Sequence, residues 1–332
     1  MKKLDFDKNV TLLAILAISA VASLSIMVLV NNDFAARISF WDNDLTGRAI
    51  STNKEDLPDL AYKTESYYFF DIGETGIIRN VNHNLGRIKF LKKYDKPVII
   101  AKPVSLKDPQ PAHTRISQVT KEGFSVKIEE WDYLDTQHGN EDIFYFVVEK
   151  GKYEIDGKSI EADFVQASDV IKAVNFENNF KDIPVVFSVV EETTYPIPLT
   201  TMLKDLDESG FYIMLQKEEK KRYFNTSIPE HLISYIAMDT GEYLEETRAH
   251  FVGRTERTVN HNWHGISLMS LKQLFSFIAE VQTSNGADTA DIRYKNLDSH
   301  GVEIMIQEER SLDSETRHNE EIVGYLISGA LS

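Results

Sequence analysis

Adjacent glutamates, among them Glu129–Glu130, Glu191–Glu192 and Glu308–Glu309, are residues whose type could support acid/base chemistry. Two carboxyl groups on either side of a bound substrate can act as general acid and general base, as in glycoside hydrolysis. In a β-strand, however, neighbouring side chains point to opposite faces of the sheet and cannot act on one substrate together. The sequence therefore predicts no acid/base site at Glu129–Glu130, Glu191–Glu192 or Glu308–Glu309.

The histidines are the next candidates, because an imidazole can bind a metal ion or move a proton. His83 and His261 each stand in the sequence Asn-His-Asn, where a hydrogen bond at a turn or strand end is the expected role. His264 follows three residues later, but this spacing does not fix a zinc site in a strand or turn, and the chain has no cysteine. No glycine-rich phosphate loop and no Ser-His-Asp order stands out. We expect a non-enzymatic protein with no metal and no cofactor.

The segments that must position these residues belong to an internal repeat. A separation of 178 residues places 81–84 on 259–262, both of which read Val-Asn-His-Asn, and places Gly123 on Gly301. A separation of 87 residues places Gly123 on Gly210. One separation that explains several matches predicts a chain built from copies of one structural unit.

Each copy contains a segment in which apolar and polar residues alternate, as in a strand with one face in a core. The residues expected to face the core are Phe124, Val126, Ile128, Phe211, Ile213, Leu215, Val302, Ile304 and Ile306. Two more apolar segments recur in each copy, at 97–101 and 143–149, 184–190 and 233–239, and 274–281 and 322–328. Many short strands without a convincing helix indicate small antiparallel β-sandwiches.

The predicted organisation is an all-β chain of three tandem sandwiches, at 73–157, 158–247 and 248–332. A linker and aromatic packing segment, 31–72, precedes them. Arg115 and Arg293 occupy the same position in two copies, beside recurring acids. We therefore expect both arginines to form ion pairs within the chain.

The first copy resembles the H-type lectin domain over residues 115–151. The resemblance is carried by Gly123 at the start of a strand, the sequence Glu-Trp-Asp-Tyr-Leu-Asp at 130–135, a polar loop at 136–140, and a closing strand that contains Tyr145. The third copy keeps fewer of these features and the second keeps fewest. The resemblance implies six-stranded antiparallel sandwiches that form trimers and bind sugars between subunits. Three copies in one chain could then form an internal pseudo-trimer.

The resemblance also implies a sugar site in the first copy, formed by Trp131, Asp132, Tyr133, Asp135 and His138. An indole can stack on the apolar face of a pyranose while nearby polar groups bind the hydroxyls. Packing in a core or interface is the alternative role for this tryptophan. The chain departs from the family pattern, because Asp132 stands where the family often has histidine, and the other copies have Glu218 and Glu309 in place of the tryptophan.

Composition limits the partners of this protein. The 52 acidic and 36 basic side chains give a formal net charge of −16. Such a surface repels phosphate backbones, so we expect no nucleic-acid partner. The absence of cysteine excludes disulfides, and each sandwich must be held together by packing.

The amino-terminal region has a different character. No charged residue occurs from Val10 to Val30, and Lys2, Lys3 and Lys8 precede this segment. As a helix it would span about 31 Å, close to the thickness of a bilayer core. We expect a membrane anchor at residues 1–30 with its amino terminus in the cytoplasm and the sandwiches outside, in the periplasm or at the cell surface. The alternative is a signal peptide cleaved near Ala22, which would release a secreted protein.

Two functions follow as hypotheses. In the first, the chain is a membrane-anchored binding protein that recognises surface glycans through Trp131, Asp132 and Tyr133. In the second, it is a structural subunit of an envelope, surface-filament or virion assembly. Its sandwiches would then contact other proteins, and exposed apolar residues such as Tyr212 and Met214 would be contact points.

Overall fold

The computed structural model describes residues 60–332, except 192–194, 220–225, 269–270, 313 and 332. Every helix or strand assigned in this part is a β-strand, which confirms the predicted all-β class. The expected anchor at 10–30 and the alternative cleavage site near Ala22 lie outside the described residues. Within the part that is described, no helix has the length and apolar character needed to cross a bilayer.

The strands form three consecutive sets of seven. The first set, called the first repeat below, consists of β1 (Lys63–Phe69), β2 (Gly73–Val81), β3 (Gly86–Lys89), β4 (Pro97–Ser105), β5 (Ala112–Thr120), β6 (Gly123–Glu130) and β7 (Glu141–Glu149). The second repeat consists of β8 (Gly151–Ile155), β9 (Lys158–Ala167), β10 (Lys172–Asn175), β11 (Val185–Val190), β12 (Thr200–Lys204), β13 (Gly210–Gln216) and β14 (His231–Met238). The third repeat consists of β15 (Gly241–Glu245), β16 (Arg248–Arg254), β17 (His264–Ser267), β18 (Gln273–Val281), β19 (Ala290–Lys295), β20 (Gly301–Glu308) and β21 (Val323–Ala330).

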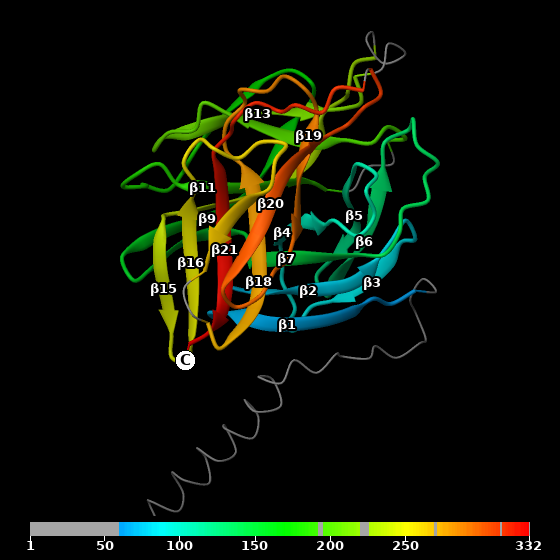
Figure 1. Ribbon diagram of the computed structural model, residues 1–332. Coiled ribbons are helices and arrows are strands. Elements are labelled where there is room, and N and C mark those ends of the chain that lie inside the picture. Colours follow the sequence, from blue (N-terminus) through cyan, green and yellow to red (C-terminus); the bar gives the residue numbers. More distant parts are fainter. Residues whose placement is uncertain (1–59, 192–194, 220–225, 269–270, 313, 332) are drawn as a thin grey trace, which may run out of the picture. The chain divides into compact units, whose positions relative to one another are not determined.

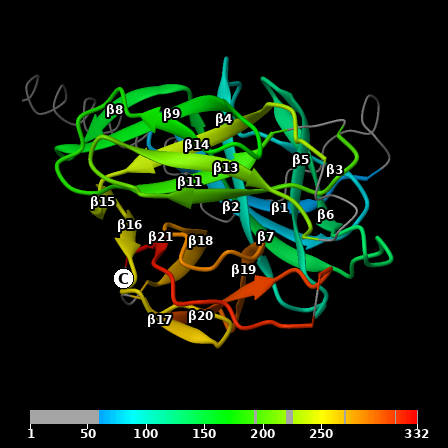
Figure 2. The same ribbon diagram turned by 90° about the horizontal axis from the view of Figure 1, so that it is seen from above.

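Each repeat has the same strand order. A four-stranded sheet runs β1-β2-β7-β4 in the first repeat, β8-β9-β14-β11 in the second and β15-β16-β21-β18 in the third. A three-stranded sheet runs β3-β6-β5, β10-β13-β12 and β17-β20-β19. In addition, β19 pairs in parallel with β4, which joins sheets of the third and first repeats (Figure 1). Figure 2 shows the second repeat, in green, and the third, in yellow to red, on different sides of the molecule.

The repeat contains one more strand than the sequence pattern indicated. The boundaries expected at 73, 158 and 248 coincide with the starts of β2, β9 and β16. The strand before each boundary pairs antiparallel with the strand after it, so each hairpin belongs to one repeat. The resulting seven strands compare with six implied by the resemblance.

The two sheets of each repeat enclose the residues that alternation assigned to the core. All nine of the expected inward-facing side chains on β6, β13 and β20 are at most 2% exposed. The centre of the molecule is formed by β4, β11 and β18, which contact one another pairwise. Ile100, Phe187 and Ile278 occupy the same position on these three strands, and all are fully buried in a single cluster. The three repeats therefore share a core, and hydrophobic burial stabilises their association.

A glycine begins β6, β13 and β20, and at the first two the neighbouring strand passes too close for a side chain. A Cβ atom at Gly123 would lie 2.1 Å from the carbonyl oxygen of Ile88, and one at Gly210 would lie 2.1 Å from that of Val174. At Gly301 the nearest atom would be 3.1 Å away. The repeated glycines thus stand at equivalent places in the three repeats.

This geometry predicts unequal effects of one substitution at three equivalent positions. Gly123→Ala and Gly210→Ala should each lower the free energy of unfolding by about 1–3 kcal/mol, because the strand pair must separate to admit the methyl group. Gly301→Ala should have a clearly smaller effect. Urea unfolding followed by fluorescence measures all three. Equal losses at the three positions would contradict the close approach.

Candidate functional site

The repeats contact one another in a cycle through one equivalent position of each. Arg115 on β5 donates hydrogen bonds to the carbonyl oxygens of Tyr195 (3.1 Å) and Ile197 (3.3 Å) in the second repeat. Met202 on β12 accepts a hydrogen bond from Ser284 Oγ (3.3 Å) in the third repeat. In each case the strand contacts the loop that follows the central strand of the next repeat.

Arg293 on β19 completes the cycle by contacting the first repeat. Its side chain is fully buried and donates to the carbonyl oxygen of Ser105 from Nε (3.0 Å) and Nη2 (2.6 Å). Burial lowers the pKa of this guanidinium to about 10, while nearby Glu141 opposes the shift. The ion pairs expected at the two arginines are present, Arg115 Nε to Glu129 Oε2 at 2.5 Å and Arg293 Nη2 to Glu141 Oε1 at 2.9 Å.

The tryptophan of the expected sugar site lies inside this junction between repeats. Trp131 is 2% exposed, and its ring centroid lies 4.7 Å from that of His113. The backbone N–H of Tyr133 donates to Glu218 Oε2 (3.1 Å) in the second repeat, and its hydroxyl accepts from the N–H of Arg310 (3.0 Å) in the third. A sugar could stack on the indole only if the junction opened, so burial favours the packing alternative.

The residues that replace this tryptophan in the other copies take part in the same junction. Glu218 and Glu309 occupy its position and are 1% and 6% exposed. Glu309 Oε1 accepts from the N–H of Glu219 (2.8 Å), and Glu219 Oε1 accepts from the N–H of Thr289 (2.8 Å). Burial, with repulsion from neighbouring acids, raises the pKa of Glu219 to about 7. Glu218 and Glu309 therefore each connect one repeat to another.

The other residues of the expected sugar site differ from Trp131 in exposure and in partners. Asp132 is half-buried, and Asp135 is exposed and accepts a hydrogen bond from the N–H of Gln137 (3.0 Å). His138 is buried in a separate cluster, where its Nδ1 lies 3.0 Å from Glu130 Oε1 and its Nε2 lies 3.4 Å from an oxygen of a second glutamate, Glu141.

The third repeat contains the same Glu-His-Glu cluster. His318 Nδ1 lies 2.8 Å from Glu308 Oε1, and Nε2 lies 3.6 Å from Glu321 Oε1. Burial disfavours the imidazolium, but the two glutamates outweigh it and raise the pKa of His318 to about 9. At neutral pH this histidine is a buried cation that neutralises two buried acids.

The Asn-His-Asn motifs support these clusters. His83 Nδ1 lies 2.9 Å from the carbonyl oxygen of His138, and His261 Nδ1 lies 3.2 Å from that of His318. The hydrogen-bonding role expected for the two motif histidines is confirmed.

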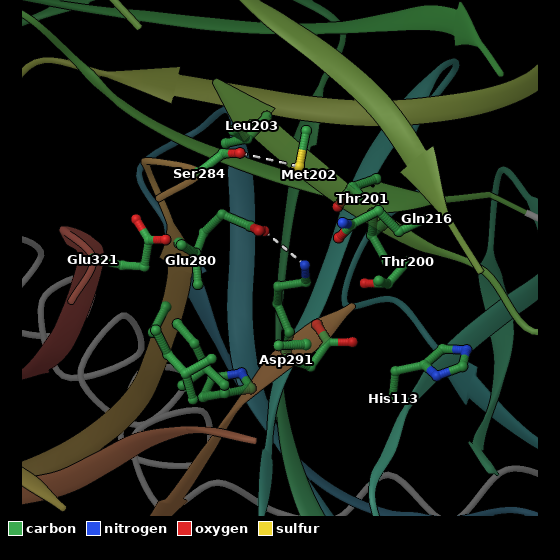
Figure 3. A pocket seen from close by; sticks show the side chains of 18 of the residues that line it. His113, Thr200, Thr201, Met202, Leu203, Gln216, Glu280, Ser284, Asp291 and Glu321 are labelled. Atoms are coloured by element: carbon green, nitrogen blue, oxygen red, sulfur yellow. Dashed lines mark hydrogen bonds and ion pairs between the residues drawn. The ribbon is translucent and has the colours of Figure 1, made fainter. Parts of the chain in front are cut away.

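A cavity with both apolar and polar lining, called the junction cavity, lies where the three repeats meet (Figure 3). Its volume is about 50 Å³, and its lining includes the pair Lys102 and Glu280, whose Nζ and Oε2 atoms are 2.6 Å apart. The first repeat contributes Lys102 and the third contributes Glu280, at the same position of β4 and β18. Sequence analysis did not identify this pair, although its separation of 178 residues is the repeat separation.

A larger cleft, called the side cleft, lies between the first and third repeats and has a volume of about 510 Å³. Its apolar lining includes Phe144 and Phe275. Its polar lining contains three basic and three acidic side chains, Arg79, Lys107, Lys295, Glu65, Asp142 and Asp298. Such a cleft has the size of a small-molecule site and combines apolar contact with balanced polar groups.

One group of acids in the described part of the chain is spaced closely enough to contact a metal ion. Asp288, Glu308 and Glu315 bring carboxylate oxygens within 4.8 Å of one another. Glu308 is already bonded to His318, and Glu315 is exposed.

Comparisons with known proteins give one relative. The chain is 26% identical over 255 residues to a protein named halomucin from Haloquadratum walsbyi, and the alignment covers 73% of this chain. The same alignment covers 3% of halomucin, so the chain corresponds to a small part of that protein. No protein-family model matches the chain, and no solved structure matches it.

Proposed function

We propose that this chain is a non-enzymatic surface protein that forms one pseudo-trimeric body and binds another protein through its second repeat. The cyclic contacts of Arg115, Met202 and Arg293 support the pseudo-trimer. The apolar segment 10–30 supports attachment to a membrane, with the repeats on its outer side. The similarity to halomucin, a mucin by name, is compatible with a place at the cell surface.

The observation that carries this proposal is a pair of exposed apolar side chains in the second repeat, at positions where the other repeats have polar residues. Val170 is 67% exposed where the first and third repeats have Asn84 and Asn262, both exposed. Tyr212 is 42% exposed on β13 where the third repeat has Glu303. Because repeats of one origin differ here in polarity, we infer that this face of the second repeat contacts a partner protein.

A double substitution that copies the third repeat tests the proposal. The proposal predicts that the wild-type chain purifies from native membranes in detergent as a complex with its partner, and Val170→Asn combined with Tyr212→Glu should remove this complex. The fold should survive, because neither side chain is buried. Size-exclusion chromatography with light scattering gives the particle mass, and the thermal midpoint checks folding.

Leu244→Asn is the matched control, since Leu244 is 54% exposed but lies on β15 of the third repeat. It should leave the complex intact. A wild-type chain that purifies as a free monomer, or a complex that persists in the double variant, would refute the assembly function.

Glycan recognition is the second candidate, and the side cleft favours it. A hydroxyl group both donates and accepts, so a polyhydroxylated ligand can bond to the acids and the bases of this lining at once. Phe144 and Phe275 could contact its apolar face. A glycan array probed with the folded protein tests this candidate. Binding that is lost on Lys107→Ala and kept on Trp131→Phe would place the sugar in the side cleft and not at the tryptophan.

A further inference from the structure

The junction cavity brings together one side chain from the same position of each repeat. His113, Thr200 and Asp291 are equivalent, because they pair across their sheets with Glu129, Gln216 and Gln307, which are separated by 87 and 178 residues from the first. All three line the cavity, and Figure 3 shows Thr200, Gln216 and Asp291 close to Glu280 around its interior. The cavity is thus built by the pseudo-threefold arrangement.

Three polar side-chain atoms at this cavity are hidden from solvent and have no hydrogen-bond partner among the described residues. Asp291 Oδ2 has no hydrogen-bond partner among the described residues. The same holds for Nδ1 and Nε2 of His113, a residue that is 4% exposed, although Nε2 lies 3.4 Å from Glu129 Oε2. Proteins rarely leave such atoms without a partner, because an unpaired buried polar group is costly. The cavity has room for the missing partner, since a water molecule occupies about 30 Å³ in the liquid.

The charges around the cavity select the kind of partner. Lys102 is already paired with Glu280, whose Oε2 also accepts from the N–H of Ser188 (3.2 Å). Two more acids line the cavity: Glu321 lies 3.6 Å from His318, and Asp288 has partners of its own. The carboxylate of Asp291 forms no ion pair with a described residue, and its Oδ2 has no hydrogen-bond partner among them. Thr200 and Gln216 add neutral oxygen donors from the second repeat. Oxygen ligands with one negative charge suit a hard cation, and a divalent ion would require more carboxylates and would be repelled by Lys102.

We propose that the junction cavity binds one monovalent cation, Na⁺ or K⁺, on Asp291 with Thr200 and Gln216 as further ligands. The ion links the third repeat to the second at the point where the first also contributes His113. It therefore stabilises the assembled pseudo-trimer and has no role in the separate repeats. This inference does not depend on the partner-binding face of the second repeat.

Thermal unfolding in different salts at equal ionic strength tests the site. Because this acidic chain is stabilised by any salt through screening, tetramethylammonium chloride serves as the reference, its cation being too large for the cavity. NaCl or KCl should raise the thermal midpoint further and saturably, by about 2–4 °C for each tenfold increase in concentration above half-saturation. Asp291→Asn should remove this extra shift, while Asp182→Asn, a change at an exposed acid, should keep it.

A second variant and a direct measurement complete the test. Thr200→Val, which removes an oxygen without changing charge, should weaken the cation-specific shift if Asp291→Asn does not fold. Crystals soaked in Tl⁺, which replaces K⁺, should show anomalous density beside Asp291. Equal midpoints in all three salts, or Tl⁺ absent from the cavity, would mean that it holds water alone and would overturn the proposal.

Discussion

Arg293→Met is expected to lower the free energy of unfolding by about 3–5 kcal/mol, a large part of the stability of a typical domain. Methionine is the residue at the same position of the second repeat, Met202, so its size and shape are tolerated in that environment. In the third repeat the arginine is fully buried and bonds to Ser105, Asp108, Gln110 and Glu141. Its loss leaves carbonyl oxygens and a buried carboxylate without their cation. Urea unfolding monitored by circular dichroism gives the loss.

Arg115→Met is the matched control for this prediction. Arg115 makes the equivalent contact with the second repeat, but 14% of its side chain is exposed. Water can therefore replace part of the hydrogen bonds that its partners lose. We expect a loss of about 1–2 kcal/mol. A loss at Arg115 as large as that at Arg293 would show that burial does not set the difference.

Stability is expected to fall as pH rises from 4.5 to 9, in two steps. Burial raises the pKa values of the carboxyl groups of Glu74, Glu191, Glu219 and Glu280 to about 7. The folded state binds these protons more tightly than the unfolded chain, so their contribution is present below about pH 4.5 and lost as pH rises through 7. His318, with its pKa raised to about 9, contributes fully below about pH 6.5 and loses that contribution as pH rises through 9.

The upper step, the deprotonation of His318, is expected to lower the free energy of unfolding by about 3 kcal/mol, the value that corresponds to the raised pKa of this histidine. His318→Gln removes the titrating group. We expect the variant to be less stable than the wild-type protein below pH 6.5, and its stability to be nearly constant from pH 7.5 to 9.5. Denaturant midpoints measured at half-unit pH intervals on both proteins resolve the steps. An upper step of the same size in the variant would assign it to another group.

The burial of Trp131 shows that a short sequence motif does not determine whether a side chain is exposed. The sequence Glu-Trp-Asp-Tyr-Leu-Asp resembles a sugar site because the family presents its tryptophan in a shallow site between subunits. In this chain the neighbouring repeats supply Glu218 and Arg310, which bond to Tyr133 and cover the junction. Exposure of a side chain depends on all elements packed over it, and no local pattern contains that information.

Much of the architecture could be predicted from the sequence. The alternation on β6, β13 and β20 identified the buried faces, because side chains in a strand alternate between two sides. The apolar segments at 97–101, 184–190 and 274–281 correspond to β4, β11 and β18, the buried centre. The first strand of each repeat was not assigned to it, because a strand at the edge of a sheet is only partly buried and carries a weak pattern.

The sequence by itself determined the strand type, the copy number and the equivalence of Gly123, Gly210 and Gly301. Periodicity and repeat separation are properties of the sequence itself, so they can be recognised without knowledge of tertiary contacts. The tertiary structure alone decided that the repeats close into a cycle. It also decided that Lys102 meets Glu280 and that Trp131 is covered, because each of these depends on contacts between residues far apart in the chain.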